Sequence, residues 1–219
     1  MEPLSHISGV IALSMGAAWA SGINLYATLL TLGILQLTGD IALPPDLHIL
    51  SHPMVLAASG FMFLTEFIAD KTPGVDTGWD VLHTFIRIPA GALLAAGAVG
   101  EINPALQLTA GILGGGLAAG THATKAGTRV LINASPEPFT NWMASLTEDM
   151  AVVGGVIAAL HFPVLFIALL AIFILLAIWF LPKIWRGVRA MFAAIGRAFG
   201  ARPPEPPAGA DPHPPAGLG

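Results

Sequence analysis

Residues Val164–Leu181 read VLFIALLAIFILLAIWFL, which is eighteen consecutive apolar residues. A helix needs about 20 mostly apolar residues to cross the hydrocarbon core of a bilayer, so this stretch is typical of a transmembrane helix. The rest of the chain agrees, because 55% of its 219 residues are hydrophobic and only 10% are charged. An average soluble domain carries about 25% charged residues. The composition therefore indicates a membrane protein and argues against a soluble enzyme.

Five apolar segments precede this stretch, and together they predict an all-α, polytopic bundle of about six transmembrane helices. The first segment is longer than one crossing requires, and its middle contains Gly22 and Asn24, which favour helix weakly. A long tilted helix and a helix broken at Gly22 both fit it. The predicted spans are approximately Ile7–Leu37, Pro53–Asp70, Val81–Gly100, Leu106–Ile132, Met143–Leu160 and Val164–Leu181.

Lysine and arginine lie on one side of this predicted bundle. The loops expected on the other side, 39–52, 101–104 and 161–163, contain neither residue. Because basic residues are retained in the cytoplasm, this bias predicts an inner-membrane protein with cytoplasmic N- and C-termini.

The chain divides into three parts by composition. Residues 1–182 form the predicted bundle, and residues 201–219 are rich in proline and glycine, which is typical of disorder. Residues 183–200 read as a basic amphipathic helix whose arginines reach anionic lipid headgroups. A partner-binding helix is the alternative for this segment.

Two parts of the chain resemble each other at an offset of 63 residues. Trp79 aligns with Trp142 and Gly91 with Gly154, and each copy contains a proline in the turn between two spans. We therefore predict two parallel two-helix repeats, about 53–100 and 116–163, related by an axis along the membrane normal. The alignment places Glu66 opposite Arg129.

Ionisable residues recur at helical spacing inside the predicted spans. Asp76, Asp80, His83 and Arg87, at the start of the third span and just before it, fall at i, i+4, i+7 and i+11, which places them on one helix face. Charged groups in a bilayer are costly and usually face a bundle interior or a water-filled cavity. The candidate residues for such a cavity are Asn24, Glu66, Asp70, Asp80, His83, Arg87, His122, Lys125, Arg129, Glu148 and Asp149.

Two interpretations of these charges remain open. Ion pairs within a structural core would explain them, and so would a polar cavity, open to the cytoplasm, that binds or conducts a solute. Seven acidic residues face four basic ones in this region, which is more acid than pairing requires. His83 and His122 could titrate near neutral pH and couple transport to protons, whereas the basic residues would suit an anion.

We therefore predict a small transporter or channel for an ion or small solute. A metal-dependent membrane enzyme acting on a lipid phosphate or headgroup is the first alternative, with Asp70, Asp76 and Asp80 as Mg²⁺ ligands. A membrane scaffold without transport is the second. No motif in the sequence indicates a cofactor, and no basic patch indicates binding to nucleic acid. The sequence does not decide whether the protein forms homo-oligomers.

Four motifs together resemble one known family. They begin at Ala20 (ASGINLYAT), Glu66 (EFIADKTPGVD), His83 (HTFIRIPAG) and Ser135 (SPEPFTNW). They are similar to the bacterial membrane-protein family catalogued as domain of unknown function 4126 (DUF4126), over roughly residues 8–180. This resemblance implies a membrane protein and supplies no activity.

Overall fold

The computed structural model describes residues 2–72, 74–134 and 138–198. Within these ranges the chain is helical and contains no strand, so the predicted all-α bundle is confirmed. The helices are α1 (Glu2–Thr38), η1 (Pro45–Ser51), α2 (Pro53–Ala69), α3 (Val75–Val99), η2 (Gly100–Ile102), α4 (Pro104–Asn133), α5 (Pro138–His161) and α6 (Pro163–Ala198).

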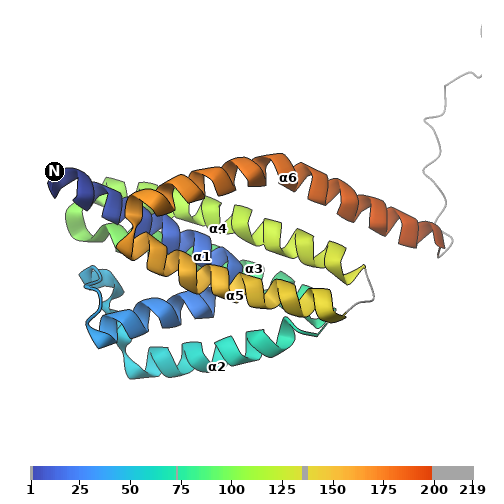
Figure 1. The fold of residues 1–219 in the computed structure, drawn as a ribbon, viewed down its shortest axis with the longest axis horizontal. Helices are drawn as coiled ribbons and strands as arrows, with labels where there is room; N and C mark the ends of the chain where they lie inside the picture. The colour runs from blue at the N-terminus through green and yellow to red at the C-terminus, as the bar shows by residue number, and fades with distance from the viewer. Residues whose placement is uncertain (1, 73, 135–137, 199–219) are drawn as a thin grey trace, which may run out of the picture.

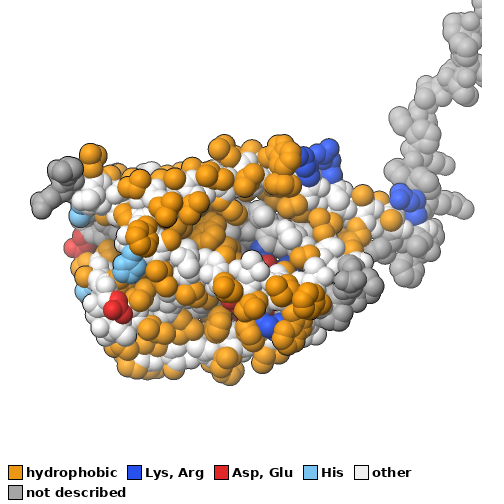
Figure 2. Space-filling view, in the orientation of Figure 1, with side chains coloured by type: hydrophobic (Ala, Val, Ile, Leu, Met, Phe, Trp, Pro, Cys, Tyr) orange, Lys and Arg blue, Asp and Glu red, His pale blue; other side chains and the backbone are white. Residues whose placement is uncertain are grey.

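Several helices are long and apolar enough to cross a membrane. Among the described residues, the ranges 4–38, 75–99, 139–161 and 163–194 each meet this requirement, and η1 with α2 forms a fifth candidate that bends by 65°. Large apolar side chains cover the outside of the bundle (Figure 2). α4 has 30 residues and is therefore about 45 Å long. It is long enough to cross a bilayer, but its sequence is more polar than those of the candidate spans.

α1 does not run straight through the bundle as a single tilted helix would, because it turns back partway along it. Its backbone leaves the helical region at Asn24, with φ −144° and ψ 100°. Figure 1 shows the two arms of α1 running in opposite directions, while α2 to α6 each run from one end of the bundle to the other. The break lies two residues after Gly22, so the broken-helix alternative describes this segment better than the tilted helix.

Contacts with α3 confirm the reversal of α1. Ser14 Oγ on the first arm donates a hydrogen bond to the carbonyl of Ala95, near the end of α3. Tyr26, just past the break, contacts His83 near the middle of α3. Leu47, after the second arm, returns to the end of α3 and packs against Gly97. The chain therefore enters the bundle, reaches the depth of His83 and leaves on the side where it began.

The local sequence explains why the helix breaks at this point. Asn24 Oδ1 accepts a hydrogen bond of 3.0 Å from the backbone N–H of Ala27, so this asparagine caps the start of the second arm. Gly22 allows the turn to lie against α4, because a Cβ atom at this position would stand 2.6 Å from the carbonyl oxygen of Ala118. A larger residue would push α1 away from α4.

The apolar core lies around the arms of α1. Leu25, Leu32, Leu47 and Leu94 belong to one buried cluster that joins α1, η1 and α3, with Val152 from α5. Because α1 fills only part of the bundle's length, this apolar core also ends partway along it.

Two expectations about the termini need correction. α1 begins at the end of the bundle opposite to the end of α6 at Ala198 (Figure 1), whereas the sequence predicts that both ends of the chain lie on one side. α6 also continues through Pro182 to Ala198, and Ile184 packs against Gly127 of α4. The segment 183–198 therefore continues the last transmembrane candidate, α6, rather than forming a separate helix. The predicted tail, 201–219, lies outside the described residues.

Candidate functional site

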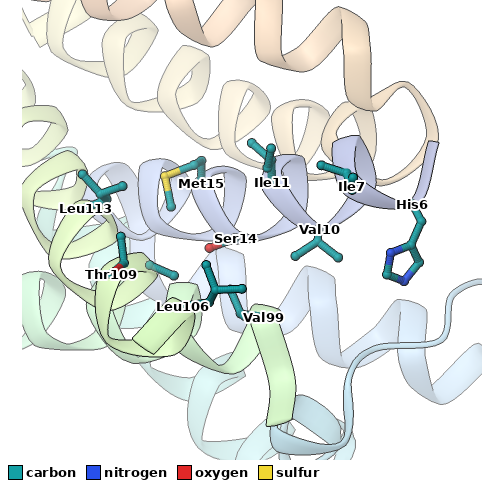
Figure 3. A pocket seen from close by; sticks show the side chains of 11 residues that line it. His6, Ile7, Val10, Ile11, Ser14, Met15, Val99, Leu106, Thr109 and Leu113 are labelled. Atoms are coloured by element: carbon teal, nitrogen blue, oxygen red, sulfur yellow. The ribbon is translucent and has the colours of Figure 1, made fainter. Parts of the chain in front are cut away.

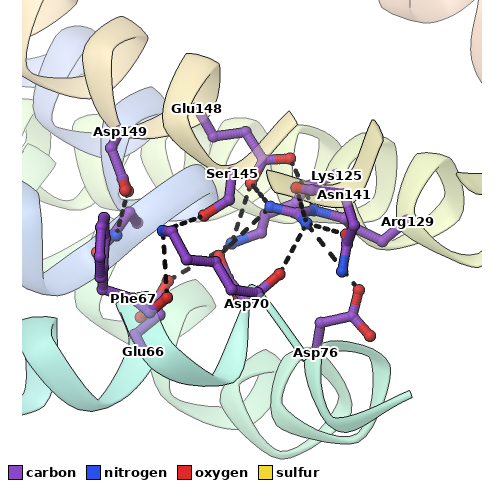
Figure 4. Close-up of polar contacts among 12 residues, drawn as sticks. Glu66, Phe67, Asp70, Asp76, Lys125, Arg129, Asn141, Ser145, Glu148 and Asp149 are labelled. Atoms are coloured by element: carbon purple, nitrogen blue, oxygen red, sulfur yellow. Dashed lines mark hydrogen bonds and ion pairs between the residues drawn. The ribbon is translucent and has the colours of Figure 1, made fainter. Parts of the chain in front are cut away.

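Charged side chains fill the half of the bundle that α1 does not reach. They come from α2, α3, α4 and α5 and are connected by ion pairs into what we call the ionic network (Figure 4). Its members are Glu66, Asp70, Asp76, Asp80, Arg87, Lys125, Arg129 and Glu148. All are buried except Glu148, whose side chain is 19% exposed.

Arg87 joins α3 to α2 and α4. Its Nη2 atom lies 2.5 Å from Glu66 Oε1, and its Nη1 atom lies 2.9 Å from Asp80 Oδ1. Nη1 also donates to His122 Nδ1 at 3.2 Å. The guanidinium group is fully buried, and its fork geometry suits two carboxylates at once.

Arg129 joins α4 to α5 near the other edge of the network. It binds Glu148 through two parallel hydrogen bonds, Nε to Oε1 at 3.1 Å and Nη2 to Oε2 at 2.7 Å. Its Nη1 atom donates to the carbonyl of Asp70 at 3.1 Å and to the Asn141 side chain. This arginine therefore also fixes the end of α2 against α5.

Lys125 lies at the centre of the network. Its Nζ atom is 3.0 Å from Asp70 Oδ2 and 3.5 Å from Glu66 Oε1. It also donates at 3.0 Å to the carbonyl oxygen of Ile23. That carbonyl is free because its usual helical partner, the N–H of Ala27, is held by Asn24. The break in α1 thus supplies a backbone ligand to the network.

Asn24 and Asp149 connect the tip of α1 to α5. Asn24 Nδ2 donates to Asp149 Oδ1 at 2.9 Å, and both side chains are buried. The predicted residue Asn24 therefore lies beside the ionic network and acts as a helix cap as well as a contact.

Hydrogen bonds fix the tautomer of His122 and one ring nitrogen of His83. Arg87 can only donate, so His122 Nδ1 must accept, and His122 Nε2 then donates to Thr84 Oγ1 at 2.8 Å. His83 Nδ1 lies 2.9 Å from the carbonyl of Trp79, and its Nε2 lies 3.1 Å from the hydroxyl of Tyr26. The contact with Arg87 therefore keeps His122 neutral, whereas the contacts of His83 are compatible with either charge state.

Of the three aspartates proposed as metal ligands, Asp76 has partners of its own, and Asp70 and Asp80 share Lys125. Asp76 accepts from Asn133 Nδ2 at 2.8 Å and from the backbone of Thr77, whereas Asp70 and Asp80 face Lys125. In the described part of the chain, no group of three or more histidine, aspartate and glutamate residues has an arrangement suited to a metal ion. The predicted ligand set is therefore not assembled.

The repeat alignment set Glu66 opposite Arg129, but these residues have different partners. Glu66 pairs with Arg87, and Arg129 pairs with Glu148. The α2–α3 and α4–α5 hairpins do turn at the same end of the bundle (Figure 1). Their charges meet through Lys125 rather than directly.

The network contains more acid than base. Five carboxylates are linked to three basic groups. Four buried carboxylate oxygens have no hydrogen-bond partner, namely Glu66 Oε2, Asp70 Oδ1, Asp80 Oδ2 and Asp149 Oδ2. Unsatisfied buried acceptors are costly, so this interior is suited to take up a proton or a cation.

A cavity of about 310 Å³ leads to the network between α1, α4, α5 and α6. Threonines 121, 124, 128 and 147 line it with Trp19 and Phe173, and Lys125 and Glu148 lie at its polar side. Figure 2 shows charged atoms inside a hollow on one face of the bundle. Only these two of the eleven predicted cavity residues border it, because ion pairs fill the space that the sequence assigned to one large cavity.

A larger hollow, of about 610 Å³, lies at the opposite end of the bundle between the first arm of α1 and α4 (Figure 3). Its lining is mostly apolar, with Val10, Leu106 and Leu113 among its residues. It shares no residue with the ionic network.

Lys71 lies in the turn between α2 and α3, at the edge of the site. Its Nζ atom contacts Ser145 Oγ at 3.3 Å and the ring of Phe67. Burial lowers the pKa of its ammonium group, and the negative charge of Asp149 opposes this effect.

Sequence reasoning missed the carbonyl of Ile23, the hydroxyl of Tyr26 and the amide of Asn133. The first two follow from the break in α1, because they face α4 and α3 only after the chain turns. Asn133 was detectable in principle as a polar residue at the end of the fourth span, close to the predicted turn.

Comparison with known proteins places the chain among its relatives. No curated protein and no solved structure matches it. The model of one family, described as a domain of unknown function (DUF4126), matches residues 11–183. This match covers most of the chain and includes every helix that contributes to the ionic network, so the protein belongs to the DUF4126 family.

Proposed function

We propose that this protein transports a small ion or solute across the inner membrane and that the ionic network lies on its path. The observation that carries this proposal is the meeting of a broken, half-crossing helix with buried charges. In many transporters, discontinuous helices supply free backbone groups to an ion or substrate site near the middle of the membrane. Here the carbonyl of Ile23 has that role toward Lys125.

The charge surplus and the free carboxylate oxygens support transport rather than packing alone. A purely structural network gains nothing from unpartnered buried acceptors, since each one lowers stability. The adjacent cavity between α4 and α5 provides space for a small solute beside Glu148.

We further propose that the end of the bundle near Lys71 and the basic half of α6 faces the cytoplasm. The basic residues of the described part of the chain lie toward this end, which agrees with the positive-inside rule. The N-terminus would then lie outside the cytoplasm, because α1 returns to the side where it began. The basic end of α6 would contact anionic lipid headgroups.

A membrane scaffold is the second candidate, and the dense pairing of Arg87 and Arg129 favours it. Buried ion pairs can fix the register of helices without binding any ligand. The two functions predict different results in a flux assay.

The test is transport by the purified full chain in proteoliposomes. Uptake of monovalent cations, small anions and protons is measured with and without imposed gradients. We expect flux of at least one of them, lowered at least tenfold in Glu66→Gln, which removes a charge from the network. Glu101→Gln is the matched control, because Glu101 is exposed in η2 at the far end of the bundle.

Absence of flux across the whole panel, with wild-type and both variants folded, would contradict transport and favour the scaffold. Equal flux in wild-type and Glu66→Gln would show that the ionic network does not lie on the transport path.

A further inference from the structure

Asp149 differs from the buried acidic residues of the ionic network, because no basic group pairs with it in the described part of the chain. Each buried acid of the network has a basic nitrogen within 4.0 Å. The side chain of Asp149 instead has one hydrogen bond, in which its Oδ1 atom accepts from the neutral amide of Asn24 on α1 at 2.9 Å. Its Oδ2 atom is buried without a partner, and the residue is only 9% exposed.

Charged groups from neighbouring elements face Asp149, but none that the structure describes is close enough to pair with it. Lys125 of α4 and Lys71 of the α2–α3 turn attract its negative charge, whereas Asp70 at the end of α2 repels it. The ammonium group of Lys125 is held by Asp70 Oδ2 at 3.0 Å. The ammonium group of Lys71 lies 3.3 Å from Ser145 Oγ. Both lysines are therefore bound elsewhere.

A carboxylate in this position would be costly, and a neutral carboxyl group would not. The network beside it already contains five carboxylates and three basic groups, so a sixth negative charge would be repelled. A buried charge without a counter-ion usually changes its protonation state instead of remaining charged. A proton on Oδ2 removes the charge and leaves Oδ1 free to accept from Asn24, as the structure shows.

We propose that Asp149 is a proton-binding site, in which Oδ2 carries the proton while Asn24 holds Oδ1. Release breaks the O–H bond, passes the proton to water and leaves a carboxylate that Lys71 and Lys125 partly offset. The site thus alternates between a neutral acid and an anion. The role of this proton as the transported or coupled ion rests on the proposed function, whereas its binding to Asp149 does not.

The protonation state of Asp149 acts on the break in α1 through Asn24. This asparagine caps the second arm of α1 with its Oδ1 atom and contacts Asp149 with its Nδ2 atom. A carboxylate accepts a stronger hydrogen bond than a neutral carboxyl group does. Loss of the proton therefore strengthens the link between α5 and the residue at which α1 turns back.

The first test measures the thermal unfolding midpoint of the purified full chain in detergent as a function of pH. Wild-type protein should lose stability as the pH rises through the range in which Asp149 releases its proton, because the folded chain binds more protons there than the unfolded chain. The expected fall is roughly 3–5 °C per pH unit. Asp149→Asn should flatten this part of the profile, because its amide resembles the neutral acid and has no proton to release.

Asp80→Asn is the matched control, because Asp80 is also buried but pairs with Arg87 and Lys125. It should lower the midpoint at neutral pH, where Asp149→Asn should be at least as stable as wild-type. Asp40→Asn, at an exposed position after α1, should leave the pH profile unchanged.

Infrared spectroscopy of the same proteins detects the proton through the C=O stretching band of a protonated carboxylic acid. Wild-type and Asp40→Asn protein should show this band at neutral pH, and Asp149→Asn should lose it.

Retention of the band in Asp149→Asn would overturn the proposal, because the proton would then lie on another carboxyl group. Parallel pH profiles of wild-type and Asp149→Asn would also overturn it. Failure of Asp149→Asn to fold would contradict it, since the amide and the neutral acid are close in shape. Loss of the band and a flattened profile, in a protein that carries no flux, would support the proton site and contradict the proposed function, so the two proposals fail separately.

Discussion

Individual basic residues hold the charged half of the bundle together. Lys125 and Arg129 each contact acidic groups from at least two other helices, and Arg87 contacts Glu66 of α2 and Asp80 of its own helix. Removing one member of a buried ion pair leaves its partner charged and unpaired, which costs more than the pair contributes when intact. The stability of this region therefore depends on each basic group separately.

Arg87→Ala should lower the free energy of unfolding by about 3–5 kcal/mol, because Glu66 and Asp80 both lose their closest cation. Thermal unfolding in detergent measures the effect. Arg189→Ala, on the exposed side of α6, should change the midpoint little. Equal midpoints for the two variants would mean that the network does not stabilise the fold.

Asn24 caps the second arm of α1 and also binds Asp149. Comparison with Asn103, which only caps a helix, separates the two contributions. Asn24→Ala removes the cap of the second arm of α1 and the hydrogen bond to buried Asp149. Asn103→Ala removes the cap of α4, where the side chain accepts from Ala105 N at 2.8 Å at an exposed position.

Loss of either cap should cost about 1 kcal/mol, and the unsatisfied carboxylate should add about 1–3 kcal/mol in Asn24→Ala alone. Unfolding midpoints of both variants measure the difference. Equal losses would show that the contact with Asp149 contributes nothing.

At the scale of elements, α1 shows what the sequence could and could not predict. The apolar segments and proline-marked turns predicted the helices α2 to α6, because span length and loop composition determine them locally. The reversal of α1 was not predictable from length, since a segment of 31 apolar-rich residues also fits one tilted crossing. It depends on contacts of Gly22 and Gly33 with distant backbone atoms.

The close contact between Gly22 and the backbone of α4 at the break in α1 can be tested by substitution. Gly22→Ala would place a Cβ atom 2.6 Å from the carbonyl of Ala118, and the resulting strain should cost about 1–3 kcal/mol. Gly116→Ala on α4, where no atom lies within 4 Å of the new Cβ, should be neutral or stabilising by up to about 1 kcal/mol. A Gly22→Ala protein as stable as Gly116→Ala would argue against this packing of α1 on α4.

The sequence predicted which residues form the candidate site but not which of them pair with one another. Helical spacing grouped Asp80, His83 and Arg87 on one face of α3, and the structure places all three toward the interior. Spacing within one helix says nothing about partners on another, so the pairing of Glu66 with Arg87 could not be foreseen. For the same reason the sequence suggested one open cavity where ion pairs fill most of the space.

At the scale of the whole molecule, the bundle has two halves of different chemistry. The arms of α1 pack apolar side chains into one part of the bundle, and the ionic network (Figure 4) occupies the other. The boundary between them is Asn24, where the helix ends and its free carbonyl faces Lys125. This division explains why so many charges occur in a chain of this hydrophobicity: they replace the missing half of a central helix.

The half-crossing of α1 is the claim on which the rest depends, and single-cysteine labelling tests it most directly because the chain contains no cysteine. Leu4→Cys, Ile49→Cys and Ala194→Cys introduce exposed positions before α1, after α1 and near the end of α6. In oriented membranes, a membrane-impermeant maleimide should label residues 4 and 49 from one side and residue 194 from the other. Labelling of residues 4 and 49 from opposite sides would contradict the account, because α1 would then cross the membrane completely.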